Sequence, residues 1–130
     1  MRHVELAKKL LQWNTKNLVA QAGLKKSEIG NFFAETFQVK ANGRNYDANY
    51  DNYFEFLNQF RSTIRSIDYD LQDFIVDKAH VVIPLTAHII RIDGRAEDFA
   101  AILILQFNKN NKIVLWHEVY TAVLHTPKHI

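Results

Sequence analysis

The chain of 130 residues contains no cysteine, so disulfide bridges, thiolate nucleophiles and cysteine-ligated metal sites are excluded. It also lacks any stretch that approaches the roughly 18 consecutive apolar residues of a membrane-spanning helix. The N-terminus does not read as a secretory signal, because Glu5, Lys8 and Lys9 interrupt any apolar segment there. We therefore expect a cytoplasmic protein that makes no contact with a membrane.

A strong excess of charge is missing as well. The chain has 16 basic and 14 acidic side chains and a formal net charge of +2. Its longest basic runs are the pairs Lys8–Lys9 and Lys25–Lys26. A surface that binds nucleic acid concentrates lysine and arginine on one element, so no nucleic-acid partner is expected.

Sequence motifs for metal binding, for cofactor binding and for catalysis by a serine nucleophile are absent too. Phosphate-binding loops, zinc-protease motifs and serine nucleophile elbows do not occur. The histidines are scattered, and His80 and His88 on one predicted strand would lie roughly 26 Å apart. The sequence therefore predicts no metal site and no cofactor.

What is present fits one soluble globular domain over residues 1–130. Hydrophobic residues make up 48% and charged residues 23% of the chain, which is ordinary for a protein with a buried core. Three helices are predicted between about residues 3 and 65. The first follows apolar residues at helical spacing from Val4 to about Gln21.

The second predicted helix is short and rich in phenylalanine. We expect it to begin near Ser27 and to carry Phe33, with Phe37 at its end. Gly30 inside it indicates close packing against a neighbour, since glycine costs a helix about 1 kcal/mol relative to alanine. A short strand should follow and end in the tight turn that Asn42-Gly43 indicates.

A run of tyrosine, asparagine and aspartate, Asn45–Tyr53, precedes the third helix, which is predicted to end near Arg65. This run has two interpretations, and both can be true together. Asparagine and aspartate side chains in a turn region can cap the following helix. Alternatively, Tyr46 or Tyr50 closes over a pocket.

The second half of the chain, residues 67–123, has the pattern of strands joined by tight turns. Helices separated from an antiparallel meander are typical of the α+β class. We expect a cone-shaped, curved antiparallel sheet, a partial barrel, wrapped around the three N-terminal helices, with a hollow at its mouth. The four predicted strands are Ile67–Asp77, Ala79–Ile92, Glu97–Asn108 and Lys112–Val123.

Three phrases of the sequence carry a resemblance to a known family. They are Ile29–Phe37 (IGNFFAETF), Val39–Arg44 (VKANGR) and Gln106–Glu118 (QFNKNNKIVLWHE). On the basis of these phrases, the chain resembles the nuclear transport factor 2-like superfamily and its SnoaL-like branch of polyketide cyclases. The resemblance extends from about Val4 to Val123. The resemblance implies a pocket on the concave face of the sheet for a small apolar or polycyclic molecule.

The resemblance also assigns side chains to the two faces of the sheet. Glu118 and its neighbours on the last strand should face the pocket. The expected ligand-binding residues are Trp116, Tyr120, Thr86, Ile90, Phe99, Leu103, Tyr46 and Trp13. The opposite, outer face should pack in a homodimer through Ile102, Ile104, Leu115 and Val119.

Two activities of that superfamily do not carry over to this chain. Ala41 and Leu103 stand near the positions where a ketosteroid isomerase would have its general base and its oxyanion-stabilising acid. Neither side chain can exchange a proton. The arginine and aspartate spacing of limonene epoxide hydrolase is echoed only by Arg91-Ile92-Asp93, at a predicted turn.

Glu118 and His88 form the predicted catalytic pair. A carboxyl group between Trp116 and Tyr120 should be desolvated, which raises its pKa toward neutrality. Histidine titrates near physiological pH, so the two could move a proton next to a carbonyl group. The alternative is that Glu118 pairs with a basic group and His88 is a wall residue without a chemical role.

Three functions remain open from the sequence. The first is a cofactor-independent cyclase, isomerase or lyase that uses acid–base residues in an apolar pocket. The second is a non-catalytic module that binds an apolar ligand or a partner in the same hollow. The third is a dimerisation module in which the outer face of the sheet matters most.

Overall fold

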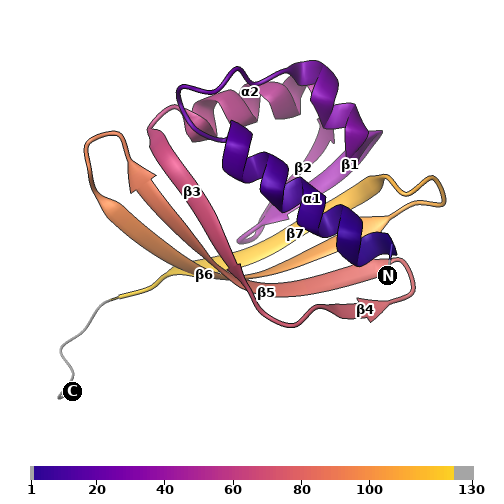
Figure 1. The fold of residues 1–130 in the computed structure, drawn as a ribbon. Helices are drawn as coiled ribbons and strands as arrows, with labels where there is room; N and C mark the ends of the chain where they lie inside the picture. The colour runs from indigo at the N-terminus through magenta and orange to yellow at the C-terminus, as the bar shows by residue number, and fades with distance from the viewer. Residues whose placement is uncertain (1, 125–130) are drawn as a thin grey trace, which may run out of the picture.

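The computed structural model describes residues 2–124 and has the α+β architecture predicted from the sequence (Figure 1). No helix in this range is long and apolar enough to span a membrane. In chain order the elements are α1 (Arg2–Asn17), the 3₁₀ helix η1 (Lys26–Asn31), β1 (Phe33–Ala41), β2 (Arg44–Asn49), α2 (Tyr50–Arg61), β3 (Ile64–Leu71), β4 (Ile75–Asp77), β5 (His80–Arg91), β6 (Ala96–Phe107) and β7 (Ile113–Ala122).

The seven strands in residues 2–124 form one curved, open sheet in the order β2-β1-β7-β6-β5-β3, with β4 paired to β5. The pairings are antiparallel except one, because β1 runs parallel to β7, with Val39 opposite Trp116 and Ala41 opposite Glu118. The predicted purely antiparallel sheet is therefore wrong at this seam. Tight turns dictate the direction of consecutive strands only, and β1 and β7 are far apart in the chain.

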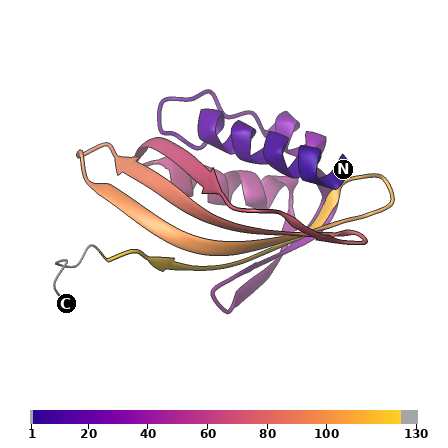
Figure 2. The ribbon, with the colours of Figure 1, turned by 60° about the horizontal axis from the view of Figure 1, so that its bottom comes forward.

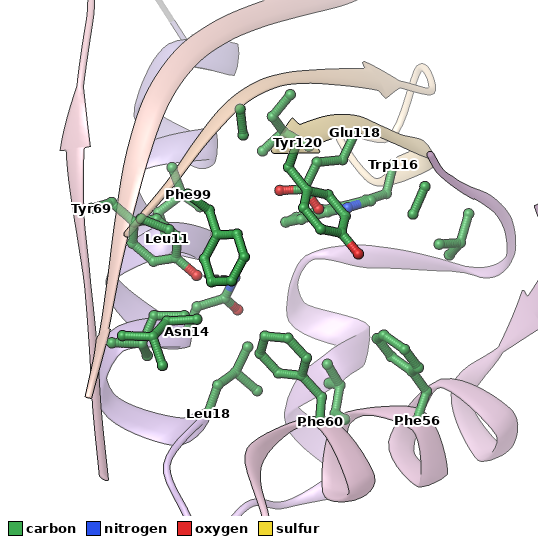
Figure 3. Close-up of a pocket in the computed structure, with 18 of the residues that line it drawn as sticks. Leu11, Asn14, Leu18, Phe56, Phe60, Tyr69, Phe99, Trp116, Glu118 and Tyr120 are labelled. Atoms are coloured by element: carbon green, nitrogen blue, oxygen red, sulfur yellow. Dashed lines mark hydrogen bonds between the residues drawn. The ribbon is translucent and has the colours of Figure 1, made fainter. Parts of the chain in front are cut away.

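Both α-helices lie on the concave side of the sheet, and no helix in the described chain covers the other side (Figure 2). The buried stripe of α1 includes Leu10 and Leu11, as the helical spacing predicts. The buried residues of α2 are Tyr53 and Leu57. Side chains from both helices and from the sheet surround a pocket (Figure 3).

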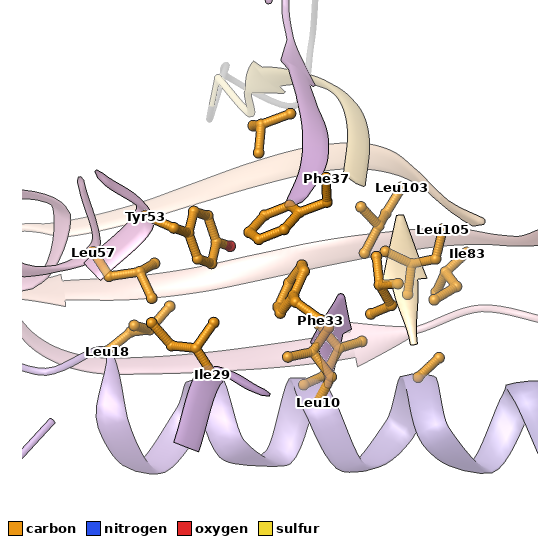
Figure 4. Packing of buried hydrophobic residues seen from close by; sticks show 14 of the residues in the cluster. Leu10, Leu18, Ile29, Phe33, Phe37, Tyr53, Leu57, Ile83, Leu103 and Leu105 are labelled. Atoms are coloured by element: carbon orange, nitrogen blue, oxygen red, sulfur yellow. The ribbon is translucent and has the colours of Figure 1, made fainter. Parts of the chain in front are cut away.

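Beside this pocket the core is closed by aromatic packing (Figure 4). The rings of Phe33 and Phe37 lie 4.5 Å apart, and the ring of Tyr53 lies 5.1 Å from each of them. Leu103 and Leu105 of β6 are fully buried in the same cluster. The helices are thus fixed to the sheet at one end of the concave face.

The second predicted helix is much shorter than expected. Only η1 forms, and Phe33 and Phe37 belong to strand β1. Phenylalanines four residues apart share one face of a helix, but the even spacing also places them on one face of a strand. The third helix ends at Arg61 instead of Arg65, and Ile64 begins β3.

Two local predictions are confirmed. A Cβ atom at Gly30 would lie 3.3 Å from the Tyr50 hydroxyl oxygen, so this glycine does pack closely against a neighbour. Asn42 and Gly43 form the turn between β1 and β2 with φ angles of 49° and 85°. Positive φ at both positions is what a tight hairpin turn of this composition requires.

Candidate functional site

A cavity of about 540 Å³ lies between the concave face of the sheet and the two α-helices. Most of the side chains that line it are aliphatic or aromatic, such as Leu11 of α1, Phe60 of α2 and Leu103 of β6. This volume is within the range of pockets that take small organic molecules.

Strand β7 contributes Trp116, Glu118 and Tyr120 to this cavity (Figure 3). Side chains alternate along a strand, so His117 and Val119 point to the outer face. Tyr120 contacts Phe99 of β6 edge to face, with 6.0 Å between the ring centroids. The sequence placed these cavity residues on the concave face, and the structure brings them together there.

Glu118 is a partly buried carboxyl group. Burial raises its pKa, and a hydrogen bond with the Trp116 side chain partly opposes that increase. The strand neighbours of Glu118 are Ala41 and Leu103, neither of which can stabilise its charge. Within residues 2–124 Glu118 forms no salt bridge, so the alternative of pairing with a basic group is not what the structure has.

Other polar groups share the cavity with Glu118. Tyr53, Tyr69 and Asn14 line it, and the Asn14 amide donates a 3.4 Å hydrogen bond to the Tyr69 hydroxyl oxygen. Burial, and to a smaller degree the negative charge of Glu118, raises the pKa of both tyrosines. These phenols therefore stay protonated and can act as hydrogen-bond donors.

In the tyrosine-rich segment the predicted helix cap is present, and one of the two tyrosines lies in the cavity wall. Asn49 caps α2 in a reciprocal capping box with Asn52, each backbone N–H donating to the other residue's side-chain oxygen at 2.9 Å. Tyr46 lines the cavity, and its buried hydroxyl has no hydrogen-bond partner within the described chain. Tyr50 is directed elsewhere and donates to the Phe33 carbonyl oxygen at 2.9 Å.

The predicted position of His88 is wrong, and with it the pairing of His88 and Glu118. On β5 the cavity is lined by Leu85, Ala87 and Ile89, so Thr86, His88 and Ile90 point to the outer face. The sequence HVVIPLTAHIIR has apolar residues at both odd and even positions. Alternation therefore could not determine which face of this strand is buried.

On the outer face the His88 ring lies between two carboxylates. Its Nδ1 is 2.7 Å from Asp98 Oδ1, and its Nε2 is 2.7 Å from Asp70 Oδ2. The hydrogen bonds to Asp70 and Asp98 raise the pKa of His88. This arrangement ties β3, β5 and β6 together and keeps the imidazole away from the cavity.

Trp13 also lies outside the cavity that it was expected to line. Its indole N–H donates to Glu28 Oε1 at 2.9 Å, and its ring contacts Phe32. The neighbouring Asn14 takes the place in the cavity wall. The sequence did contain an indication of this role, because Asn14 is a polar residue between Leu10 and Leu18 in the line of apolar residues that begins on α1.

Tyr69 and Arg91 line the cavity as well, and the sequence did not single them out for this role. Arg91 is held by Glu97 at 2.7 Å and by the Thr63 hydroxyl at 2.9 Å. Within residues 2–124 no group of three or more histidine, aspartate and glutamate side chains could hold a metal ion.

The fold is shared with solved structures of very different sequence. A proposed polyketide cyclase from Acidithiobacillus ferrooxidans has a TM-score of 0.76 and 11% identity over 92% of this chain and 88% of that one. A nuclear transport factor 2-like protein of unknown function from Burkholderia pseudomallei has a TM-score of 0.73 and 12% identity over 93% and 92%. An epoxide hydrolase from M. tuberculosis, similar to limonene epoxide hydrolase, has a TM-score of 0.70 and 11% identity over 92% and 82%.

Comparisons of the sequence itself are negative, since no family model and no curated protein matches it. Identities this low between structures show a common fold and leave the activity undetermined. The prediction made from the three sequence phrases is confirmed at that level. This chain has the nuclear transport factor 2-like fold, which it shares with SnoaL-like polyketide cyclase structures.

Proposed function

We propose that this protein binds a small apolar molecule in the cavity and moves a proton on it with Glu118, as a cofactor-independent cyclase, isomerase or lyase. His88, the other predicted catalytic residue, has no part in this proposal because it lies on the outer face. The observation that carries the proposal is a desolvated carboxyl group without an ion-pair partner in a cavity large enough for a ligand.

Keeping the Glu118 carboxyl group away from water in the cavity costs free energy when the group is charged. A carboxyl group that is desolvated and forms no ion pair does not stabilise the fold in its charged form. Its raised pKa instead brings it closer to the pH at which a general base and a general acid are both effective. Carboxyl groups in clefts whose pKa is raised by burial are candidates for chemistry for this reason.

Proton exchange on a probe ketone tests the proposal. In D2O, the α-protons of 2-tetralone would be followed by NMR with the wild-type chain and with Glu118→Gln. We expect the variant to keep the affinity for the ketone and to lose at least about 100-fold in protein-catalysed exchange, the usual range for a general base. Glu55→Gln, an exposed substitution on α2, is the matched control.

Two outcomes would redirect the proposal. Equal exchange by wild type and Glu118→Gln would contradict the role of Glu118. Binding of 2-tetralone, or of polycyclic and terpenoid-like compounds in a thermal-shift screen, without any exchange would favour the non-catalytic ligand-binding module.

We further propose that the outer face of the sheet forms a homodimer. Ile102 and Val119 are directly paired there and are 45% and 58% exposed. Ile75 of β4 is also exposed. Contiguous exposed apolar residues on a sheet are typical of a protein–protein interface.

A further inference from the structure

Apart from tyrosine, Asn14 is the only residue with a polar side chain that is buried in the described chain, and it is 5% exposed. It stands one helical turn after Leu10 on the apolar stripe of α1 and one turn before the buried Leu18, which directly follows the helix, so an aliphatic side chain would fit the pattern. An amide at such a position is unfavourable unless its polar atoms are used. Asn14 lines the cavity, and its contact there is with Tyr69 of β3.

The direction of this hydrogen bond determines what Tyr69 can do. The Nδ2 group of an amide can only donate, so the Tyr69 oxygen is the acceptor. The Tyr69 O–H proton is therefore left for another acceptor. Because burial and the nearby Glu118 raise the pKa of Tyr69, this phenol remains a neutral donor at any physiological pH.

Tyr69 and Glu118 lie on different walls of the same cavity. Figure 3 shows Tyr69 next to Asn14, across the cavity from Glu118 and Trp116. The two groups come from β3 and β7, which are separated in the sheet by β5 and β6. A molecule between them would meet a hydrogen-bond donor on one side and a carboxyl group on the other.

We propose that Tyr69, positioned by Asn14, donates a hydrogen bond to the carbonyl oxygen of an apolar ketone whose α-carbon faces Glu118. This inference rests on the proposed function and adds the substrate class to it. Tyr69 is the group that touches the ligand, and Asn14 acts through Tyr69 as a positioning residue.

The reaction that this arrangement supports is enolisation. The Glu118 carboxylate takes an α-proton, the electron pair of the broken C–H bond forms the C=C bond, and the carbonyl π pair moves to oxygen. The Tyr69 hydrogen bond stabilises the negative charge on that oxygen, and the phenol keeps its proton. Glu118 returns its proton to carbon, so no oxidant, reductant or leaving group is required.

A pair of probes isolates the carbonyl contact. 2-Tetralone and tetralin differ by the carbonyl group, and their affinities would be measured by quenching of tryptophan fluorescence. We expect the wild-type chain to bind 2-tetralone more tightly than tetralin. Tyr69→Phe should weaken ketone binding about 2- to 10-fold, as expected for one hydrogen bond, and leave the affinity for tetralin unchanged.

Asn14→Leu tests the positioning role. With the ketone at saturation, α-proton exchange should fall while the affinity for tetralin stays at the wild-type value. A merely structural role for Asn14 would change the affinity for both probes. Unchanged tetralin binding also shows that each variant is folded.

A measurement on the wild-type chain does not depend on how the variants fold. The ¹³C resonance of 2-tetralone labelled at the carbonyl carbon should move downfield on binding, because the oxygen accepts a hydrogen bond. A bound resonance at the position found in an apolar solvent would overturn the proposal. Equal affinity of the wild type for 2-tetralone and tetralin would overturn it too.

The two proposals fail in different ways. Exchange that requires Glu118 but is unaffected by Tyr69→Phe removes the carbonyl site and leaves the proposed function intact. A downfield-shifted carbonyl resonance without any exchange in the wild type removes the proposed function and leaves Tyr69 as a ligand-binding residue.

Discussion

Glu118 is a residue whose burial works against stability. Its pKa is raised by desolvation in the folded state, so the folded protein holds this proton to a higher pH than the unfolded chain does. The favourable contribution of the protonated carboxyl is fully present below the unfolded pKa. It is lost as the pH rises through the folded pKa.

The first prediction follows from this pH dependence of the Glu118 contribution to stability. Glu118→Gln should be more stable than the wild type at pH 8, and the difference should shrink toward pH 4, where both side chains are neutral. Urea denaturation at several pH values measures it. The exposed Glu55→Gln serves as the control, and a pH-independent difference for Glu118→Gln would contradict a desolvated carboxyl.

Tyr46 supplies the second prediction. Its buried hydroxyl has no partner within the described chain, and an unsatisfied buried polar group costs about 1–3 kcal/mol. Tyr46→Phe should therefore raise the free energy of unfolding by about 1 kcal/mol. Tyr69→Phe should have the opposite sign, because it leaves the buried Asn14 amide without its partner. Equal losses in both variants would show that Tyr46 is satisfied in solution.

The residues of the site differ in how well their position in the cavity wall could be predicted from the sequence. On β7, the wall residues alternate with His117 and Val119, and the resemblance indicated which set is buried. Tyr69 and Asn14 lie on separate elements, β3 and α1. Their meeting depends on how α1 crosses the sheet, and no local pattern contains that information.

At the scale of elements, the spacing of apolar residues did not distinguish a helix from a strand where it fits both. Phe33 and Phe37 satisfy both a helix and a strand, and the strand formed because β1 pairs with β2 and β7. Local turn and capping chemistry was a better guide. The Asn42-Gly43 turn and the asparagine cap of α2 act within a few residues and need no tertiary information.

The outer-face contacts of His88 connect three strands and give the third prediction. The hydrogen bonds to Asp70 and Asp98 raise its folded pKa, and Asp68 lies directly opposite on β3. This stabilisation is fully present below the unfolded pKa of about 6.5 and is lost as the pH rises through the folded value.

His88→Gln should accordingly be destabilised most near pH 6 and least at high pH. Thermal unfolding between pH 5.5 and 9 measures the difference from the wild type. The effect should be modest, because His88 is 40% exposed and water screens its ion pairs. His80→Gln on the same strand is the control, and a larger loss at pH 9 than at pH 6 would contradict the expected sign.

For the molecule as a whole, all helices in residues 2–124 lie on one face of the sheet and leave the other uncovered (Figure 2). The α+β class and the curved sheet could be predicted because helical and strand patterns occupy separate halves of the chain. The hairpin β1–β2 is the exception, and it adds the parallel seam to the sheet.

The uncovered face supplies the fourth prediction. The wild-type chain should sediment as a dimer at micromolar concentration, and Ile102→Asp should shift it to monomer by placing a charge in the apolar interface. Gln59→Asp, on the exposed side of α2, is the matched control. A wild-type monomer at micromolar concentration would refute the dimer.

The most direct test of the account is an NMR titration of the glutamate side-chain carboxyl carbons, with Glu118→Gln used to assign the Glu118 resonance. We predict that Glu118 titrates at a higher pH than the other glutamates, because burial raises its pKa. Its resonance should also shift when 2-tetralone is added, because the proposed binding site is the cavity that Glu118 lines. A Glu118 resonance that titrates together with the exposed glutamates and ignores the ketone would contradict the account.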